Sequence, residues 1–334
     1  MENNNILQVK NYLSDEDIKK LYNKLFKSNT EDINITKLTG GLKNAVYLIE
    51  CKGEKVVLKT ESCENKKTIT LDKNAMWWEA SMMKELEELD IPSPKLLYFD
   101  GSCNDIKYPY IFMSYLEGNN YLEEKGHLSE QEREYIDEQV GEICKKISKI
   151  NKNEYFIPTY SSKKIANNYE FILTLFDSII KDATLKNIKL NNIEYEEIYN
   201  LLSKNKNVLK NNEKISLCHA DLWDGNILVK DNRVSGIIDF ADMYFGDELF
   251  TFYFHTLDGV SEKFLKGYGK EKLTETEKLR IDIYEMFTIF KMIVDCDYKG
   301  YGKYDWMYKK FDEKFSKAKQ HTLCYNRQRM EMKK

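Results

Sequence analysis

Apolar positions in the first third of the chain predict a small β-rich unit. Strand patterns rich in β-branched and aromatic residues cover residues 33–39, 45–51, 55–60, 96–100 and 108–114. Between the third and fourth of these, apolar residues recur at helical spacing over residues 72–89 and stop before Pro92. Another helical pattern precedes the first strand, where Ser14 can cap it. The expected order is helix, three strands, helix, two strands.

Helical repeats dominate the rest of the chain. Expected helices cover about residues 129–150, 167–181, 194–204, 274–295 and 304–317. Two of them begin with capping boxes, Ser129 with Glu132 and Thr274 with Glu277. One β-rich stretch, residues 215–239, interrupts the helices. The pattern predicts an α+β protein with a β-rich lobe at residues 1–115 and a larger, mainly helical lobe at residues 116–334.

Composition narrows the classes of function. The 334 residues are 42% hydrophobic, which is ample for two packed lobes, and the net charge of −4 comes with scattered lysines. Nucleic-acid binding needs a basic stripe, so we do not expect it. The seven cysteines include no C-x-x-C pair, which argues against a zinc site or a disulfide framework. The chain start lacks the apolar core of a signal peptide, and no apolar run reaches the roughly 20 residues that span a bilayer. We expect a cytoplasmic protein without membrane contact.

The segment from residue 218 to residue 242, CHADLWDGNILVKDNRVSGIIDFAD, carries the most informative polar residues. Asp221 and Asn226 precede one predicted strand of a hairpin, and Asp239 follows the other. Because a hairpin brings its two ends together, these three oxygen-bearing side chains should meet, which suits Mg²⁺. An acidic surface hairpin, in which the same residues only form turns, is the alternative.

A second signal lies in the β-rich unit. Strand alternation places Val57 and Lys59 on one face, and Glu79 falls inside the apolar stripe of the predicted helix. A buried carboxylate needs a partner, and Lys59 is the natural one. Alternatively, Lys59 is solvated and Glu79 reaches water from the edge of the stripe.

These segments resemble protein-kinase-like enzymes, most closely the aminoglycoside phosphotransferase and choline kinase superfamily, over about residues 35–260. The resemblance rests on HxDxxxxN from His219 to Asn226, on the strand end Ile237-Ile238-Asp239-Phe240 and on Gly246-Asp247. It implies a bilobal protein-kinase-like fold and a kinase that uses ATP or GTP with Mg²⁺. By the same resemblance, Asp221 orients the acceptor hydroxyl and takes its proton, Asn226 and Asp239 hold Mg²⁺, and His219 braces the loop.

The resemblance also implies the residues around the nucleotide. Lys59 and Glu79 would form the strand–helix pair that reaches the phosphates. Gly40, Gly41 and Asn44 would lie in the loop that covers them, although this loop is not G-x-G-x-x-G and could be an ordinary hairpin turn. The backbone at Ser114 and Leu116 would bond the purine at the hinge between the lobes.

The acceptor is less constrained. Ala220 stands in place of the arginine of protein kinases, and the Asp239-Phe240-Ala241 sequence lacks their glycine, so a small-molecule acceptor is expected. Glu248 and Thr251 depart from the usual proline and aspartate of the family. Carboxylates that could attract a cationic acceptor are Asp242, Asp247, Glu248, Asp258 and Glu262. An aminoglycoside-like aminocyclitol comes first, and choline, ethanolamine or an amino sugar of the fructosamine type comes next. A nucleotide-binding pseudokinase regulator is the alternative of another class.

Overall fold

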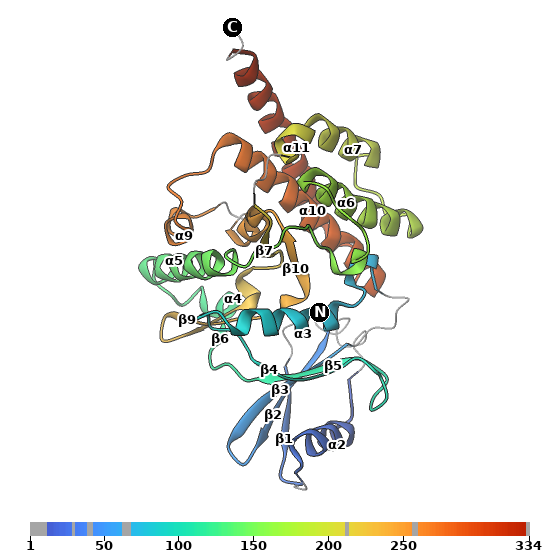
Figure 1. The fold of residues 1–334 in the computed structure, drawn as a ribbon, viewed down its shortest axis with the longest axis vertical. Helices are drawn as coiled ribbons and strands as arrows, with labels where there is room; N and C mark the ends of the chain where they lie inside the picture. The colour runs from blue at the N-terminus through green and yellow to red at the C-terminus, as the bar shows by residue number, and fades with distance from the viewer. Residues whose placement is uncertain are drawn as a thin grey trace.

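The structure is a computed structural model that describes residues 12–28, 31–38, 43–61, 68–210, 214–255 and 260–331. The side chains of residues 253–255 and 328–331 are not described. Three of the expected site residues, Gly40, Gly41 and Asp258, lie outside the described residues. Figure 1 shows a twisted sheet at one end of the molecule and a larger group of helices at the other, so the α+β class with a small β lobe and a larger helical lobe is confirmed.

The sheet has five antiparallel strands in the order β1-β2-β3-β5-β4. Their bounds are β1 Asn34–Leu38, β2 Ala45–Cys51, β3 Glu54–Thr60, β4 Leu96–Asp100 and β5 Tyr110–Ser114. Helix α2 (Asp15–Phe26) begins at Ser14, whose hydroxyl accepts from the Asp17 N–H, as predicted. The buried face of α2, with Ile18 and Leu21, packs in one core with Tyr47 and Phe112 of the sheet. The N-terminal helix therefore stabilises the β-rich end.

Helix α3 (Ala75–Glu87) begins three residues later than predicted from the sequence. Asp72, the expected start, instead ends the short 3₁₀ helix η2 (Thr70–Asp72), and its carboxylate pairs with Lys43 and Lys291 rather than capping α3. Figure 1 places α3 between the sheet and the helical part. The indole N–H of Trp78 donates to the Met243 carbonyl oxygen at 2.7 Å, which fastens α3 to the larger lobe.

After β5, the chain approaches the larger lobe closely at Gly118. A short strand, β6 (Asn119–Asn120), and helix α4 (Tyr121–Glu124) follow this glycine. Gly118 has φ +140°, and a Cβ atom there would lie 2.3 Å from Ser235 Oγ and 2.9 Å from the Val229 carbonyl oxygen. Only glycine satisfies both the backbone conformation and the close approach.

The helical part follows the predicted pattern, although α5 ends three residues earlier than expected and α6, α10 and α11 end later. Its elements are α5 Glu130–Ile147, η3 Pro158–Tyr160, α6 Asn168–Leu185, α7 Tyr195–Lys204, α8 Lys206–Lys210, η6 Glu248–His255, α9 Glu262–Tyr268, α10 Glu275–Lys299 and α11 Asp305–Glu331. Both predicted capping boxes are present. Helix α10 continues beyond residue 295 to Gly300, which caps it with φ 72°. Helix α11 extends beyond residue 317 and projects from the molecule in Figure 1.

Short strands in the larger lobe carry the predicted β-rich stretch. β8 (Ile227–Lys230) and β9 (Arg233–Ile237) form the expected hairpin, and β6 pairs with β8 on the other side. β7 (Ser216–His219) pairs instead with β10 (Met243–Gly246), which the sequence pattern did not indicate. All residues of β7 and β10 are buried, so neither strand shows the alternation that marks a half-exposed strand.

None of the helices in the described ranges is both long and apolar enough to cross a membrane.

Candidate active site

The two ends of the β8–β9 hairpin bring Asp221, Asn226 and Asp239 together, as predicted. Asn226 ends the 3₁₀ turn η4 (Asp224–Asn226), and its amide donates to the Asp221 carbonyl oxygen at 2.7 Å and to Asp221 Oδ2 at 3.2 Å. The N–H of Ile238, directly before Asp239, donates to the Asn226 carbonyl oxygen at 3.0 Å. Because both donor contacts of the Asn226 amide go to Asp221, its orientation is set and Oδ1 is left as an acceptor atom.

The side chain of His219 links the two ends of the hairpin. It is fully buried, its Nδ1 accepts from the Asp221 N–H at 3.3 Å, and its Nε2 donates to the Ile238 carbonyl oxygen at 3.1 Å. These two contacts select the neutral tautomer with hydrogen on Nε2, and burial lowers the pKa of His219. The backbone N–H of His219 donates to Thr251 Oγ1 at 3.2 Å. Thr251, which stands where the resemblance leads us to expect aspartate, therefore still supplies an oxygen acceptor. His219 thus joins the Asp221 and Asp239 segments.

Lys59 lies between two carboxylates. Its Nζ is 2.7 Å from Glu79 Oε1 and 2.9 Å from Asp239 Oδ1. Burial opposes the charge on Lys59, but Asp239 and Glu79 outweigh it and raise the pKa of Lys59. Burial raises the pKa of Glu79 against the pull of Lys59, whereas the lysine overcomes burial at Asp239 and lowers the pKa of that group. The predicted Lys59–Glu79 pair is therefore present, and it includes Asp239 as a third member.

Asp221 occupies an environment that favours its protonated form. Burial, followed by the nearby carboxylates of Asp242 and Asp239, raises the pKa of Asp221 to about 7, against the opposing influence of Lys43 and Lys291. A carboxylate whose pKa is near neutrality is suited to accept a proton at that pH.

The donor set at the hairpin ends fits a magnesium ion. Asp239 keeps 38% of its side chain exposed while Lys59 and Glu79 are buried beside it, so the carboxylate is open to solvent on one side. Its backbone has φ 67°, an uncommon conformation for aspartate that is often held at functional sites. Within the described ranges no three His, Cys, Asp or Glu side chains form a complete metal cage. Mg²⁺ commonly takes one or two protein ligands and completes its shell with phosphates and water, which matches Asp239 with Asn226.

Four alternating charges, which we call the charge ring, lie next to these groups: Lys43, Asp72, Lys291 and Asp242. Lys43 Nζ is 3.1 Å from Asp72 and 3.2 Å from Asp242, and Lys291 Nζ is 3.2 Å from Asp72 and 2.6 Å from Asp242. Burial opposes ionisation of Asp242, but Lys291 and Lys43 prevail and hold its pKa well below the usual range. Of these four residues, only Asp242 was expected at the site from the sequence.

Several carboxylates that were expected to bind the acceptor instead contact other side chains of the protein. Both oxygens of Asp242 face lysines. Asp247 is 1% exposed and accepts from Arg280 and from the Tyr284 hydroxyl at 2.6 Å, so it holds α10 rather than facing a cleft. Glu248 is half-buried, and Glu262 is exposed in the first turn of α9. Of the four expected carboxylates that the structure describes, Asp242 and Asp247 are therefore engaged by cationic side chains of the protein itself.

The hinge residues line the path from β5 to the larger lobe. The Ser114 N–H donates to the Lys95 carbonyl oxygen at 2.9 Å, and Ser114 Oγ accepts from the Lys95 N–H at 2.8 Å. The Ser114 N–H is therefore already engaged with the residue that precedes β4. Leu116 packs its side chain over Gly236. Asn44 lies half-buried directly before β2.

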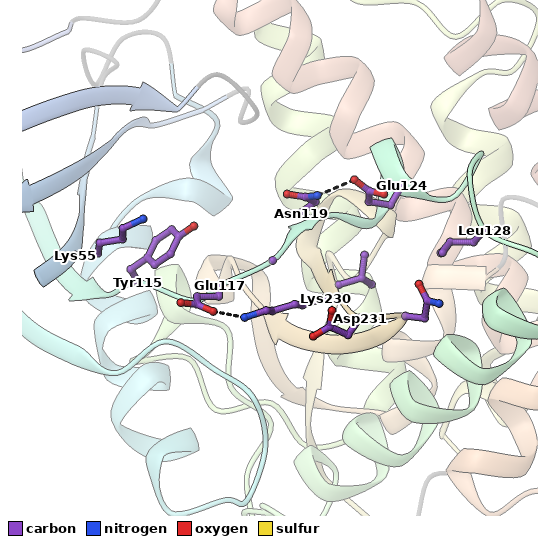
Figure 2. A pocket seen from close by; sticks show the side chains of 11 residues that line it. Lys55, Tyr115, Glu117, Asn119, Glu124, Leu128, Lys230 and Asp231 are labelled. Atoms are coloured by element: carbon purple, nitrogen blue, oxygen red, sulfur yellow. Dashed lines mark hydrogen bonds and ion pairs between the residues drawn. The ribbon is translucent and has the colours of Figure 1, made fainter. Parts of the chain in front are cut away.

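A cavity of about 400 Å³ lies beside this hinge, and Figure 2 shows the side chains that line it. Lys55 and Tyr115 line one side and Lys230 and Asp231 the other, and Lys230 forms an ion pair with Glu117. The cavity contains none of the residues around Asp221 and Lys59. It is separate from the candidate active site.

Comparisons with known proteins agree with this architecture. The model of the phosphotransferase enzyme family matches residues 34–281. The streptomycin–ATP–APH(2″)-IIa ternary complex superposes with a TM-score of 0.61 at 19% identity, over 92% of this chain and 97% of that chain. A thermostable mutant of aminoglycoside phosphotransferase APH(4)-Ia, in complex with AMP-PNP and hygromycin B, superposes with a TM-score of 0.61 at 14% identity. The superposition covers 90% of this chain and 98% of that chain. A proposed fructosamine-3-kinase from Haemophilus somnus 129PT superposes with a TM-score of 0.65 at 15% identity. The superposition covers 91% of this chain and 97% of that chain. At these identities the structures establish a shared fold. No curated protein sequence matches the chain.

Proposed function

The chain belongs to the phosphotransferase enzyme family, and from this premise we propose that it transfers the γ-phosphate of a Mg²⁺-bound nucleotide to a hydroxyl of a small molecule. The observation that carries the proposal is the convergence of Asp221, Asn226 and Asp239 beside the Lys59–Glu79 pair. A binding scaffold has no need of a buried lysine held between two carboxylates, one of which is partly exposed.

Each of these residues has a step in the proposed transfer. Asp239 and Asn226 Oδ1 would hold the metal ion, which neutralises charge on the phosphates when it is bound. Lys59, kept extended by Glu79, would position the same phosphates. Asp221 would orient the acceptor hydroxyl and accept its proton, for which its raised pKa is suited. His219 would hold the segments of Asp221 and Asp239 in fixed positions relative to each other.

The nucleotide would lie between the sheet and the β8–β9 hairpin. Gly40, Gly41 and Asn44 would cover its phosphates, and the Ser114 carbonyl and Leu116 N–H would bond the purine of ATP or GTP. What supports this placement is that β3 lies between β2 and β5, so Lys59 and the hinge strand are neighbours: Lys59 pairs with Ile111, and Val56 pairs with Ser114.

For the acceptor we propose a small cationic molecule. An aminoglycoside-like aminocyclitol comes first, supported by the shared fold with kinases solved with streptomycin or hygromycin B. Choline, ethanolamine or an amino sugar of the fructosamine type comes second, supported by the fold shared with the Haemophilus protein.

A coupled ADP- and GDP-release screen tests the proposal. The full chain with Mg²⁺ and each nucleotide is offered an aminoglycoside panel, choline, ethanolamine and amino sugars, and the expected result is acceptor-dependent release with at least one of them. Asp221→Asn serves as the control for release that is not catalysed at this site. Mg²⁺-dependent nucleotide binding without release for any acceptor would favour a pseudokinase regulator instead.

A further inference from the structure

Helix α3, which carries Glu79, packs mainly with the larger lobe. Its buried apolar residues share one hydrophobic core with residues of α5, α6 and α10. They are Met76, Trp78, Ala80, Met82, Met83 and Leu86. Strand β5 reaches the same core with Ile111 and Met113. A second core joins α2 to the sheet and, among the residues that the structure describes, includes none from α3. Helix α3 is therefore part of the body of the larger lobe, although the chain forms it between two strands of the sheet.

The short helix η2, just before α3, is bound to the larger lobe by Asp182 of α6. One carboxylate oxygen of Asp182 accepts from the Thr70 N–H at 2.6 Å, and the other accepts from the Thr70 hydroxyl at 2.8 Å. Asp182 is 3% exposed. Burial of a carboxylate is costly unless hydrogen bonds compensate for the lost water, and both donors come from Thr70. Asp182 is thus a buried acid that takes no part in the site described above.

Two more side chains of the larger lobe hold the same segment. The Thr159 hydroxyl, in η3, donates to the Leu71 carbonyl oxygen at 3.0 Å. Lys291 of α10 pairs with Asp72 at 3.2 Å. Three successive residues of η2 are therefore bound by three different elements, α6, η3 and α10. We call Asp182, Thr159 and Lys291 the η2 clamp.

The start of α3 is fixed from outside the helix. Asn74, at its N-cap, has φ 64° and makes no capping hydrogen bond with its side chain. In the first turn, the Trp78 indole donates to the Met243 carbonyl oxygen, and Glu79 follows directly. Because the regular backbone hydrogen bonds make a helix stiff, a shift of its first turn displaces Glu79 in the second. The position of Glu79 relative to Lys59 therefore depends on how η2 is held.

We propose that Asp182 is a positioning residue, which acts with the rest of the η2 clamp to fix α3, so that the larger lobe presents both Glu79 and Asp239 to Lys59. The inference rests on the proposed function, because it connects the clamp to nucleotide binding. Of the three members of the Lys59 group, only Lys59 is then carried by the sheet. Fixing Glu79 before the nucleotide binds reduces the conformational entropy that binding must otherwise remove.

A purely structural role for the clamp makes a different prediction. If Asp182 only stabilised the fold, its loss would weaken nucleotide binding equally whether or not Glu79 is present. If Asp182 acts through Glu79, its loss has no further effect once the Glu79 carboxylate is gone. A double-mutant cycle between the two residues measures this difference.

The test measures the dissociation constants of MgATP and MgGTP by calorimetry on the full chain. Asp182→Ala is expected to raise them about 10- to 100-fold, the range for a residue that orients a binding group. Thr159→Val, a milder change that keeps the shape of the side chain, is expected to raise them about 2- to 10-fold, the factor for one hydrogen bond. Combined with Glu79→Ala, either change should add less than about twofold. Asp182→Asn can still accept from the Thr70 N–H and donate to the Thr70 hydroxyl, so its affinity should stay near that of the parent.

Thr322→Val is the matched control. Thr322 is a buried threonine of α11 whose hydroxyl accepts from the Asn205 amide at 2.8 Å. The same replacement therefore removes a buried hydrogen bond between α11 and the α7–α8 connection instead of one at η2. Hydrogen exchange of the α3 backbone amides, followed by mass spectrometry, needs no nucleotide. Exchange should be faster in Asp182→Ala and Thr159→Val than in the parent, and unchanged in Thr322→Val.

The outcomes separate the inference from the proposed function. Unchanged affinity in Asp182→Ala and Thr159→Val would overturn the inference, and so would equal losses with and without Glu79. Unchanged exchange in α3 would overturn it without any nucleotide. A parent chain that binds neither nucleotide would overturn the proposed function. Losses that disappear in the Glu79→Ala background, with near-parent affinity in Asp182→Asn and Thr322→Val, would establish that the clamp acts through Glu79.

Discussion

Asp221→Asn is expected to lower kcat by about 10²- to 10⁴-fold, the usual contribution of a positioned general base. The amide cannot accept the proton of the acceptor hydroxyl, and it also disturbs the contact with the Asn226 amide. The backbone contacts of residue 221 with His219 and Asn226 do not depend on its side chain, so the loop should keep its shape. The measurement is single-turnover kinetics with the best acceptor of the release screen.

The matched control is Asp224→Asn, which changes an acid of the same loop that pairs with Lys125 at 2.9 Å, away from Asp239. We expect the dissociation constant of MgATP to stay within about threefold in Asp221→Asn, because the proposed metal ligands Asn226 and Asp239 are retained. Equal turnover by parent and Asp221→Asn would exclude Asp221 as the base.

Lys59→Ala is expected to reduce kcat/KM for the nucleotide by about 10²- to 10³-fold, the loss typical of one preorganised charge at developing negative charge. The change removes the cation that both Glu79 and Asp239 contact, so it also leaves two carboxylates without the charge that lies between them. Removing one partner of a buried ion pair costs about 3–5 kcal/mol, and unfolding in urea should show a loss of this order.

Lys55→Ala is the matched control for Lys59→Ala. Lys55 lies on the same strand but is exposed and pairs with Glu50 at 3.0 Å, so its removal should change neither quantity appreciably. The KM for the acceptor should stay near the parent value in Lys59→Ala. A raised acceptor KM with unchanged nucleotide kinetics would show that Lys59 does not face the phosphates.

Local patterns were sufficient to predict much of the fold and the centre of the site. Side-chain alternation indicated the strand that carries Lys59, capping boxes located the starts of α5 and α10, and a hairpin between Asn226 and Asp239 predicted that its two ends meet. In each case the physical cause lies within one element or between two that are adjacent in sequence. Only the Lys59–Glu79 pair required a step between elements, and the burial of a carboxylate in an apolar stripe supplied it.

The features missed from the sequence depend on contacts between distant segments. Lys43 and Asp242 are 199 residues apart in the chain, and no spacing rule connects them with Lys291. Asp72 resembled a helix start because aspartate commonly caps helices, yet the ring engages its carboxylate. Strand β10 lacks alternation because its residues are all buried. Asp247 resembled a surface acid until the structure placed it against Arg280.

Binding of Mn²⁺ in place of Mg²⁺ tests most directly whether the hairpin ends form a divalent-cation site beneath Lys59. Electron paramagnetic resonance of free Mn²⁺, titrated with the full chain and a non-hydrolysable ATP analogue, gives the metal affinity of the parent, of Asp239→Asn and of Asp231→Asn. Asp231 is exposed in the turn at the far end of the same hairpin, and its replacement should have no effect. We expect Asp239→Asn to weaken Mn²⁺ binding by at least about tenfold, since even the loss of a supporting partner of a metal ligand has an effect of that size. Equal Mn²⁺ affinity in the parent and Asp239→Asn would contradict the metal site.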